Sequence, residues 1–202
     1  MDPKQAVADI VRINEHIASF WGDGSWAPEG AAQLLSKSRL NWQVSLSRML
    51  ERWIEPPELD LQDAHLILAW ANLGALLEGT LKWFLCVYYD NYSESPVRRK
   101  EKLIEPDELC FKRLVEFFSA TVWTRSQSEE LTPFADGIRN KRNAIHAYQD
   151  RKLGTHEEFR KAGVKYRSFL LDHEGQVPWP NEQYDYPVDI RKMHLDGTAL
   201  QE

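Results

Sequence analysis

Cysteine, glycine and proline are all scarce in this chain of 202 residues, which has 2, 10 and 10 of them. Two cysteines without a CxxC pair exclude a disulfide framework and a cysteine-based zinc site. Few glycines and prolines exclude a fibrous repeat and a low-complexity chain. Because Cys86 and Cys110 lie in apolar segments, we expect both to be reduced thiols in the core of a cytoplasmic protein.

An excess of positive charge is also missing, since 25 Lys and Arg stand against 31 Asp and Glu, for a formal net charge of −6. That balance excludes a protein that coats its whole surface with nucleic acid, so any RNA contact must be a local patch. The first twenty residues contain no uninterrupted apolar run, because charged residues recur through them. The sequence therefore predicts neither a signal peptide nor contact with a membrane.

Several catalytic signatures are absent from the sequence. It has no phosphate-binding glycine loop, no HExxH and no GxSxG. Nucleotide-dependent, zinc-peptidase and serine-hydrolase functions are therefore not indicated, and we predict no cofactor and no metal site.

Apolar residues recur at three- and four-residue intervals through most of the chain, and this period predicts an all-α fold. Residues 61–89 are the most apolar stretch and are expected to form the central helix, while 90–105 are expected to be a solvated loop. No strand and no repeat is predicted. The expected helices cover about 2–20, 30–54, 61–89, 106–123, 133–154 and 155–172.

These helices predict a bundle of four main helices with an additional N-terminal helix. We expect one helical domain over residues 1–175, of which 1–30 form the extra helix and its loop. Residues 176–202 contain three prolines and no sustained period, and predict an irregular tail. The tail is expected to lie across the bundle through Trp179, Tyr184 and Tyr186.

One segment of the fifth expected helix carries residues suited to chemistry. Arg139, Asn143 and His146 are spaced i, i+4 and i+7, which places them on one face of a continuous α-helix. Arginine offers a permanent cation with a planar donor fork, and histidine titrates near neutral pH, a combination suited to a phosphodiester. The alternative interpretation is an exposed helix whose histidine makes a structural hydrogen bond.

The residues between these polar groups are expected to position the helix. Ile138 and Ile145 would hold it against the core, and the small Ala144 and Ala147 would let a second helix approach closely.

The same segment resembles the signature of the HEPN superfamily, helical bundles in which an Arg and a His are separated by four to six residues on a late helix. The residue directly after the Arg is commonly Asn, Asp or His. Arg139, Asn140 and His146 match this pattern with six intervening residues. The apolar stretch Leu77–Phe84 is similar to the second helix of many such bundles, and it contains Glu78.

Two other Arg and His pairs fit the spacing but not the context. Arg151 and His156 are separated by Gly154, which should interrupt a helix. Arg167 and His173 are followed closely by a glycine, so that His173 is expected where the helix frays. We therefore expect only Arg139 and His146 to form the signature.

The resemblance implies a metal-independent endoribonuclease that works as a two-fold homodimer on RNA, with toxin and antiphage effector as its candidate roles. In that reading Arg139 binds the phosphate and His146 transfers protons, and an antitoxin or another protein is a further partner. The other residues implied are Asn140 and Asn143 for orientation, Lys141 and Arg142 for attraction of RNA, and Glu78 and Tyr148 as further candidates. The rival hypothesis is a non-catalytic helical module for interaction or regulation, since fold does not fix function.

Overall fold

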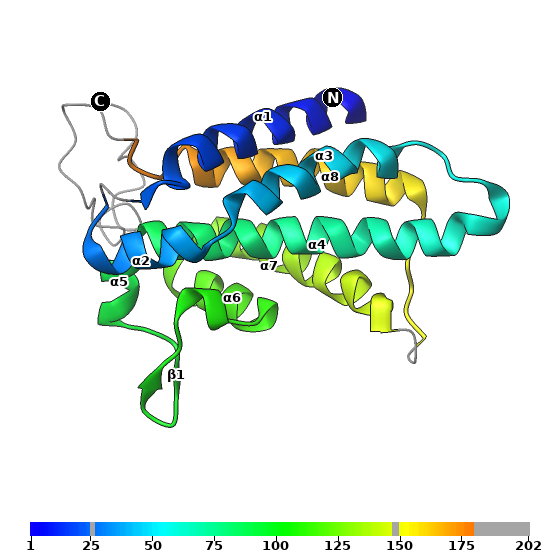
Figure 1. Cartoon of the computed structure of the whole chain (residues 1–202). Helices are drawn as coiled ribbons and strands as arrows, with labels where there is room; N and C mark the ends of the chain where they lie inside the picture. The colour runs from blue at the N-terminus through cyan, green and yellow to red at the C-terminus, as the bar shows by residue number, and fades with distance from the viewer. Residues whose placement is uncertain (25–26, 147–149, 180–202) are drawn as a thin grey trace.

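The computed structural model describes residues 1–24, 27–146 and 150–179, and helices fill most of that range (Figure 1). This confirms the all-α class. The α-helices are α1 Pro3–Trp21, α2 Glu29–Lys37, α3 Leu40–Ile54, α4 Gln62–Val87, α5 Tyr89–Glu94, α6 Phe111–Phe117, α7 Arg125–Arg142 and α8 His156–Glu174.

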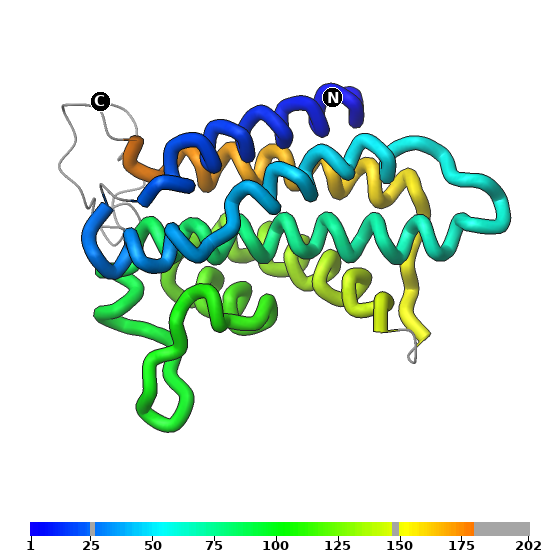
Figure 2. The backbone as a smooth tube through the Cα atoms, in the orientation of Figure 1, coloured from blue at the N-terminus to red at the C-terminus, as the bar shows by residue number. Residues whose placement is uncertain are grey.

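Helix α4 is the centre of the bundle. It packs against α2, α3, α7 and α8, while α1 lies outside against α3 and α8 (Figure 2). One apolar face is buried throughout and consists of Leu66, Trp70, Leu73, Leu77, Leu81, Phe84 and Tyr88. Among the described residues, Leu59–Val87 is one stretch long and apolar enough to span a membrane by length and composition, and 56% of its most apolar window is buried in the bundle. Packing in the core accounts for that apolar character.

The single helix predicted over 30–54 is wrong, because the chain breaks between α2 and α3. Arg39 adopts a left-handed conformation with φ of 52°, and the Ser38 hydroxyl donates to the Leu35 carbonyl at 2.6 Å. The break sets the register of α3, which leaves two large apolar side chains on its outer face. Trp42 is 59% exposed and Met49 43% exposed. The buried positions are Leu40, Val44, Ser47, Leu50 and Ile54.

The segment expected to be a solvated loop contains α5 and a two-stranded antiparallel hairpin, β1 Arg98–Arg99 and β2 Lys102–Leu103. The prediction of no strand is therefore wrong for these four residues. The expected helix over 106–123 is also divided. A 3₁₀ turn at Pro106–Glu108 precedes α6, and a π-helical turn at Phe118–Val122 follows it.

Two capping boxes set the starts of the last two helices. Thr124 with Gln127 begins α7 at Arg125, earlier than the prediction from Pro133, which lies inside the helix. Thr155 with Glu158 begins α8 as predicted.

The two cysteines differ in burial. Cys86 on α4 is buried, and burial raises the pKa of its thiol. Cys110 is exposed, because it is the residue that precedes α6 rather than part of the inner face of a helix. The prediction of a core thiol is confirmed for Cys86 and wrong for Cys110.

The start of the expected tail lies against α1. The Trp179 ring stacks on His16 with centroids 4.1 Å apart, and its indole N–H donates to the Glu174 carbonyl at 3.1 Å. Tyr184 and Tyr186 lie outside the described residues.

Candidate functional site

The predicted site lies where α7 ends. The α-helix stops at Arg142, and Asn143–His146 form a 3₁₀ turn, so the expectation of an unbroken helix through His146 is wrong. Because a 3₁₀ turn advances about 120° per residue rather than 100°, ideal helix periods shift the expected direction of His146 by roughly 60° from that of Arg139. The two residues lie on the same side of the chain but not on one line.

The change of helix type also alters the apolar positions. Ile138 is buried as predicted, but Ile145 is 48% exposed and does not hold the turn against the core. Ala144 is buried instead, within its own chain. It is therefore not a free surface for a second helix, and Ala147 lies outside the described residues.

Arg139 is fixed by one contact and open elsewhere. Its Nε donates to Asp136 Oδ1 at 2.9 Å, and its side chain is 23% exposed. Within the described residues, no other hydrogen bond engages the guanidinium. The salt bridge on one edge leaves the two Nη groups available to a bidentate acceptor such as a phosphate.

The guanidinium borders a surface cavity of about 310 Å³ between α6 and α7. Lys112 and Glu116 on α6 and Thr132 and Asp136 on α7 are among the residues that line it. The cavity therefore offers two cations and two carboxylates as well as hydroxyl groups.

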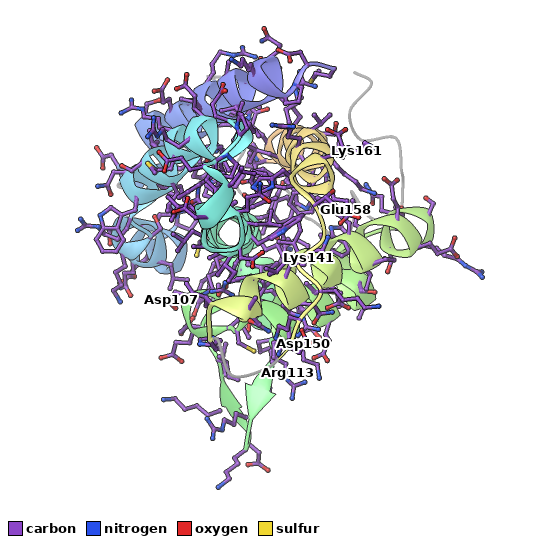
Figure 3. All side chains as sticks on the ribbon, turned by 90° about the vertical axis from the view of Figure 1, so that its right-hand side faces the viewer. Asp107, Arg113, Lys141, Asp150, Glu158 and Lys161 are labelled. Carbon is purple, nitrogen blue, oxygen red and sulfur yellow. The ribbon has the colours of Figure 1, made fainter. Side chains whose placement is uncertain are left out.

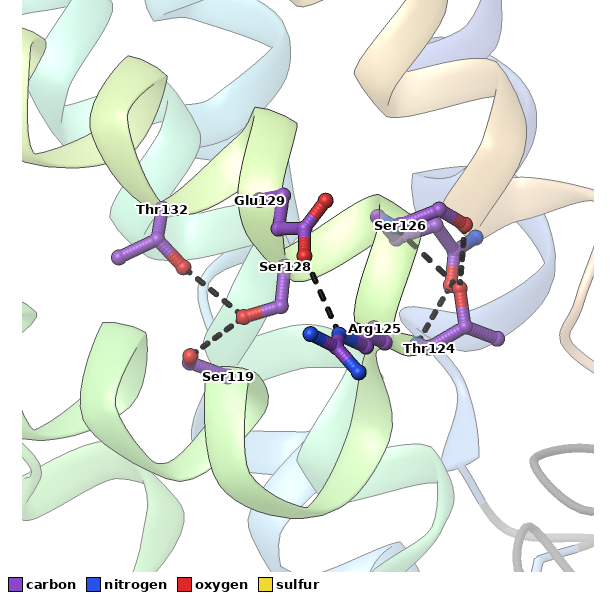
Figure 4. A network of polar contacts seen from close by, with 8 residues as sticks. Ser119, Thr124, Arg125, Ser126, Ser128, Glu129 and Thr132 are labelled. Atoms are coloured by element: carbon purple, nitrogen blue, oxygen red, sulfur yellow. Dashed lines mark hydrogen bonds and ion pairs between the residues drawn. The ribbon is translucent and has the colours of Figure 1, made fainter.

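A chain of hydroxyl groups runs beside this cavity (Figure 4). Ser119 Oγ lies 2.5 Å from Ser128 Oγ, and Ser128 Oγ lies 3.3 Å from Thr132 Oγ1. Ser119 and Thr132 also line the cavity. These contacts fasten the π-helical turn to α7 and set the shape of the cavity wall.

Glu78, a candidate acidic residue, pairs with two cations. Its carboxylate lies 2.6 Å from Arg142 Nη1 and 3.0 Å from Lys82 Nζ, and its side chain is only 14% exposed. Arg142 also packs on Gly74, where an added Cβ would lie 2.7 Å from Arg142 Cδ. Glu78 and Arg142 therefore join α4 to the end of α7.

Lys141 has internal partners as well. Its Nζ lies 3.3 Å from Glu158 Oε2 and 4.3 Å from the centre of the Trp70 ring, and Figure 3 shows it beside Glu158. Since Arg142 is paired too, neither of the two cations expected to attract RNA has a free charge in this arrangement.

The remaining predicted residues differ in exposure. His146 and Asn140 are exposed, Asn143 is half-buried, and Tyr148 lies outside the described residues. No hydrogen bond to the His146 ring occurs within the described part of the chain. Arg139 thus pairs with Asp136, and Glu78 pairs with Arg142. Arg139 and His146 make no hydrogen bond with each other.

The two other spaced histidines have structural partners. His156 Nε2 lies 3.2 Å from His65 Nδ1, and burial together with the neighbouring His65 lowers the pKa of His156. His173 is buried inside α8 among aromatic rings, and burial lowers its pKa to about 4. The expectation that His173 lies at a frayed end is wrong.

Sequence reasoning missed Asp136 and Lys112 beside Arg139. Asp136 precedes Arg139 by three residues, a spacing at which side chains on a helix meet, so the pair was visible in the sequence. Lys112 comes from another helix, and no local pattern indicates it. Among the described residues, no three His, Cys, Asp or Glu side chains form a group that could hold a metal ion.

Comparisons of the chain with protein-family models, with curated proteins and with solved structures find no match.

Proposed function

We propose that the chain is a metal-independent endoribonuclease of HEPN type in which Arg139 and His146 act on the RNA backbone. The observation that carries the proposal is the state of Arg139: its Nε is held by Asp136, no other described residue hydrogen-bonds its guanidinium, and the residue lines a surface cavity. His146, exposed on the turn that follows, supplies an imidazole that can accept and donate a proton.

The reaction needs only groups that these residues provide. His146 removes the proton from the 2′-hydroxyl, and the 2′-oxygen attacks the adjacent phosphorus. The bond from phosphorus to the 5′-oxygen breaks, and that oxygen takes up a proton. Arg139 stabilises the negative charge on the phosphoryl oxygens. The products are a 2′,3′-cyclic phosphate and a 5′-hydroxyl.

A two-fold homodimer completes this proposal. Two proton transfers are best served by two groups, and each chain has one histidine in the signature. A two-fold axis beside the end of α7 would bring both copies of Arg139 and His146 into one cleft. His146 is exposed on the 3₁₀ turn and has no hydrogen-bond partner among the described residues, which leaves its ring accessible to a second chain.

The test compares cleavage of labelled RNA by wild type, Arg139→Ala and His146→Ala. Both variants should lose cleavage and stay folded. His146→Ala should keep the wild-type melting temperature within a few degrees, since substitutions of exposed residues typically cost under ~0.5 kcal/mol. His156→Gln is the matched control and should cleave within a few fold of wild type. Full activity in His146→Ala would refute the assignment.

The second candidate is a non-catalytic module that binds another protein, such as an antitoxin. The exposed Trp42 and Met49 on the outer face of α3 favour it, because large apolar side chains on a surface are typical of interaction sites. This candidate would be supported over the first if the chain cleaves no RNA and forms, without RNA, a stable complex with another protein that depends on Trp42.

A further inference from the structure

The hairpin β1–β2 projects from the bundle on the side away from α1 (Figures 1 and 3). Arg98 pairs with Leu103 and Arg99 with Lys102, and Lys100-Glu101 form the turn. The base of the hairpin is anchored, because the Ile104 N–H donates to the Val97 carbonyl at 3.0 Å and the Tyr92 hydroxyl donates to the Ile104 carbonyl at 2.5 Å. The strands therefore carry their side chains on a fixed support.

The hairpin concentrates positive charge in an acidic protein. Arg98, Arg99, Lys100 and Lys102 are all exposed, against the single carboxylate of Glu101. Most other lysines and arginines in the described chain lie within 4 Å of a carboxylate, whereas none of these four does. The one contact of the four is from Arg98 Nη1 to the Glu101 carbonyl at 2.9 Å. Their charges are available to a polyanion.

The turn is built from unfavourable residues. Lys100 and Glu101 have φ of 50° and 68°, a left-handed conformation that hairpin turns usually assign to Asn-Gly. Lys100 makes the turn less stable than Asn would at this position, and it places a long cationic side chain at the tip. Strain of this kind concentrates at functional positions.

The location of the hairpin fits the candidate site. It lies on the same side of the bundle as α6 and α7, opposite α1, in both Figure 1 and Figure 3. Helix α6 follows the hairpin in the chain and carries Lys112, which lines the Arg139 cavity. Cations thus occur on the hairpin, on α6 and at the end of α7.

We propose that this hairpin binds the phosphate backbone of single-stranded RNA through Arg98, Arg99, Lys100 and Lys102, without reading its sequence. This inference rests on the proposed function for the choice of RNA as the polyanion. The hairpin would hold the strand on the side of the bundle where α6 and α7 lie. Affinity should therefore depend on salt and on the length of the RNA.

The experiment measures binding of labelled single-stranded RNA by fluorescence anisotropy over a range of salt concentrations. The full chain carries His146→Ala to prevent cleavage. Replacing the four hairpin cations by Gln should weaken binding about tenfold or more near 0.1 M salt and reduce the slope of log Kd against log salt by up to about 3. The matched control replaces four exposed cations elsewhere, Arg12, Lys37, Arg52 and Lys161, by Gln and should bind within about twofold of the parent.

Three results would overturn the inference: RNA binding unchanged in the hairpin variant, equal weakening in the control, or no RNA binding by any form. Binding of phosphatidylserine–phosphatidylcholine vesicles that is lost in the hairpin variant while RNA binding stays intact would assign the hairpin to a membrane surface instead. If RNA binds through the hairpin but the wild-type chain, which keeps His146, never cleaves it, the proposed function is refuted and this inference still holds. Circular dichroism melts confirm that each variant is folded.

Discussion

Protonation of His173 should destabilise the fold as pH falls. The ring is buried against Phe84, Phe118, Trp123 and Phe169. The Trp123 indole N–H donates to its Nε2 at 3.2 Å, so Nδ1 carries the proton and donates to the Phe169 carbonyl at 2.8 Å. Both nitrogens are used by the neutral ring. A second proton on Nε2 would face the indole N–H in an apolar environment.

The size of the effect follows from the two pKa values. Burial lowers the pKa of His173 from 6.5 to about 4 in the folded chain. Between these values the unfolded chain binds more protons, so acidification favours unfolding, and stability present above pH 6.5 is lost as pH falls toward 4. The full loss is ~3 kcal/mol, of which about 2 kcal/mol has occurred by pH 5.

The assay is urea denaturation at pH 8 and pH 5 of wild type and His173→Gln. Gln cannot titrate but can still accept a hydrogen bond from Trp123. At pH 8 the variant should be less stable than wild type by about 1 kcal/mol. Wild type loses about 2 kcal/mol of stability between pH 8 and pH 5 through His173 and the variant does not, so the difference should shift by about 2 kcal/mol in favour of the variant at pH 5. Other groups that titrate in this range, including Asp172 with its raised pKa, cancel in the comparison. A deficit that is the same at both pH values would refute the reasoning.

Three further predictions concern packing, pairing and assembly. Gly74→Ala should lower the free energy of unfolding by about 1–3 kcal/mol in urea denaturation, because the added Cβ meets the inner atoms of the Arg142 side chain. An unchanged urea midpoint would contradict the close approach of Arg142 to Gly74. Glu78→Gln should destabilise by about 1–2 kcal/mol, since two cations lose their carboxylate, and Glu78→Asp should recover part of the loss. Light scattering should give twice 23.6 kDa for the wild type, and a mixture of inactive Arg139→Ala and His146→Ala chains should regain cleavage; a species of 23.6 kDa alone at micromolar concentration would refute the shared cleft.

The sequence predicted those elements whose signals are local. The apolar residues of α4 recur at helical spacing and the capping box of α8 spans three residues, and the structure has both helices where they were expected. The break at Arg39 was not predictable, because neither Ser38 nor Arg39 is a usual helix breaker. This one left-handed residue sets the register of α3 and therefore which side of the helix is buried.

The candidate site was predicted in residue type more than in geometry. The positions of Arg139 and His146 on one helix assumed a constant α-helical period, which fails where Asn143 begins a 3₁₀ turn. Arg142 pairs with Glu78 and Lys141 pairs with Glu158, and both partners come from distant segments, so sequence spacing could not show that these two cations are engaged. The hairpin cations were assigned to a solvated loop, because the pairing of two-residue strands leaves no period to detect.

The most direct test of the account is the chemistry of the RNA ends produced by the purified chain in excess chelator. Cleavage through His146 and Arg139 predicts a 2′,3′-cyclic phosphate on one fragment and a 5′-hydroxyl on the other, with neither formed by His146→Ala. Fragments that carry a 5′-phosphate, or the same cyclic phosphate released at full rate by His146→Ala, would contradict it.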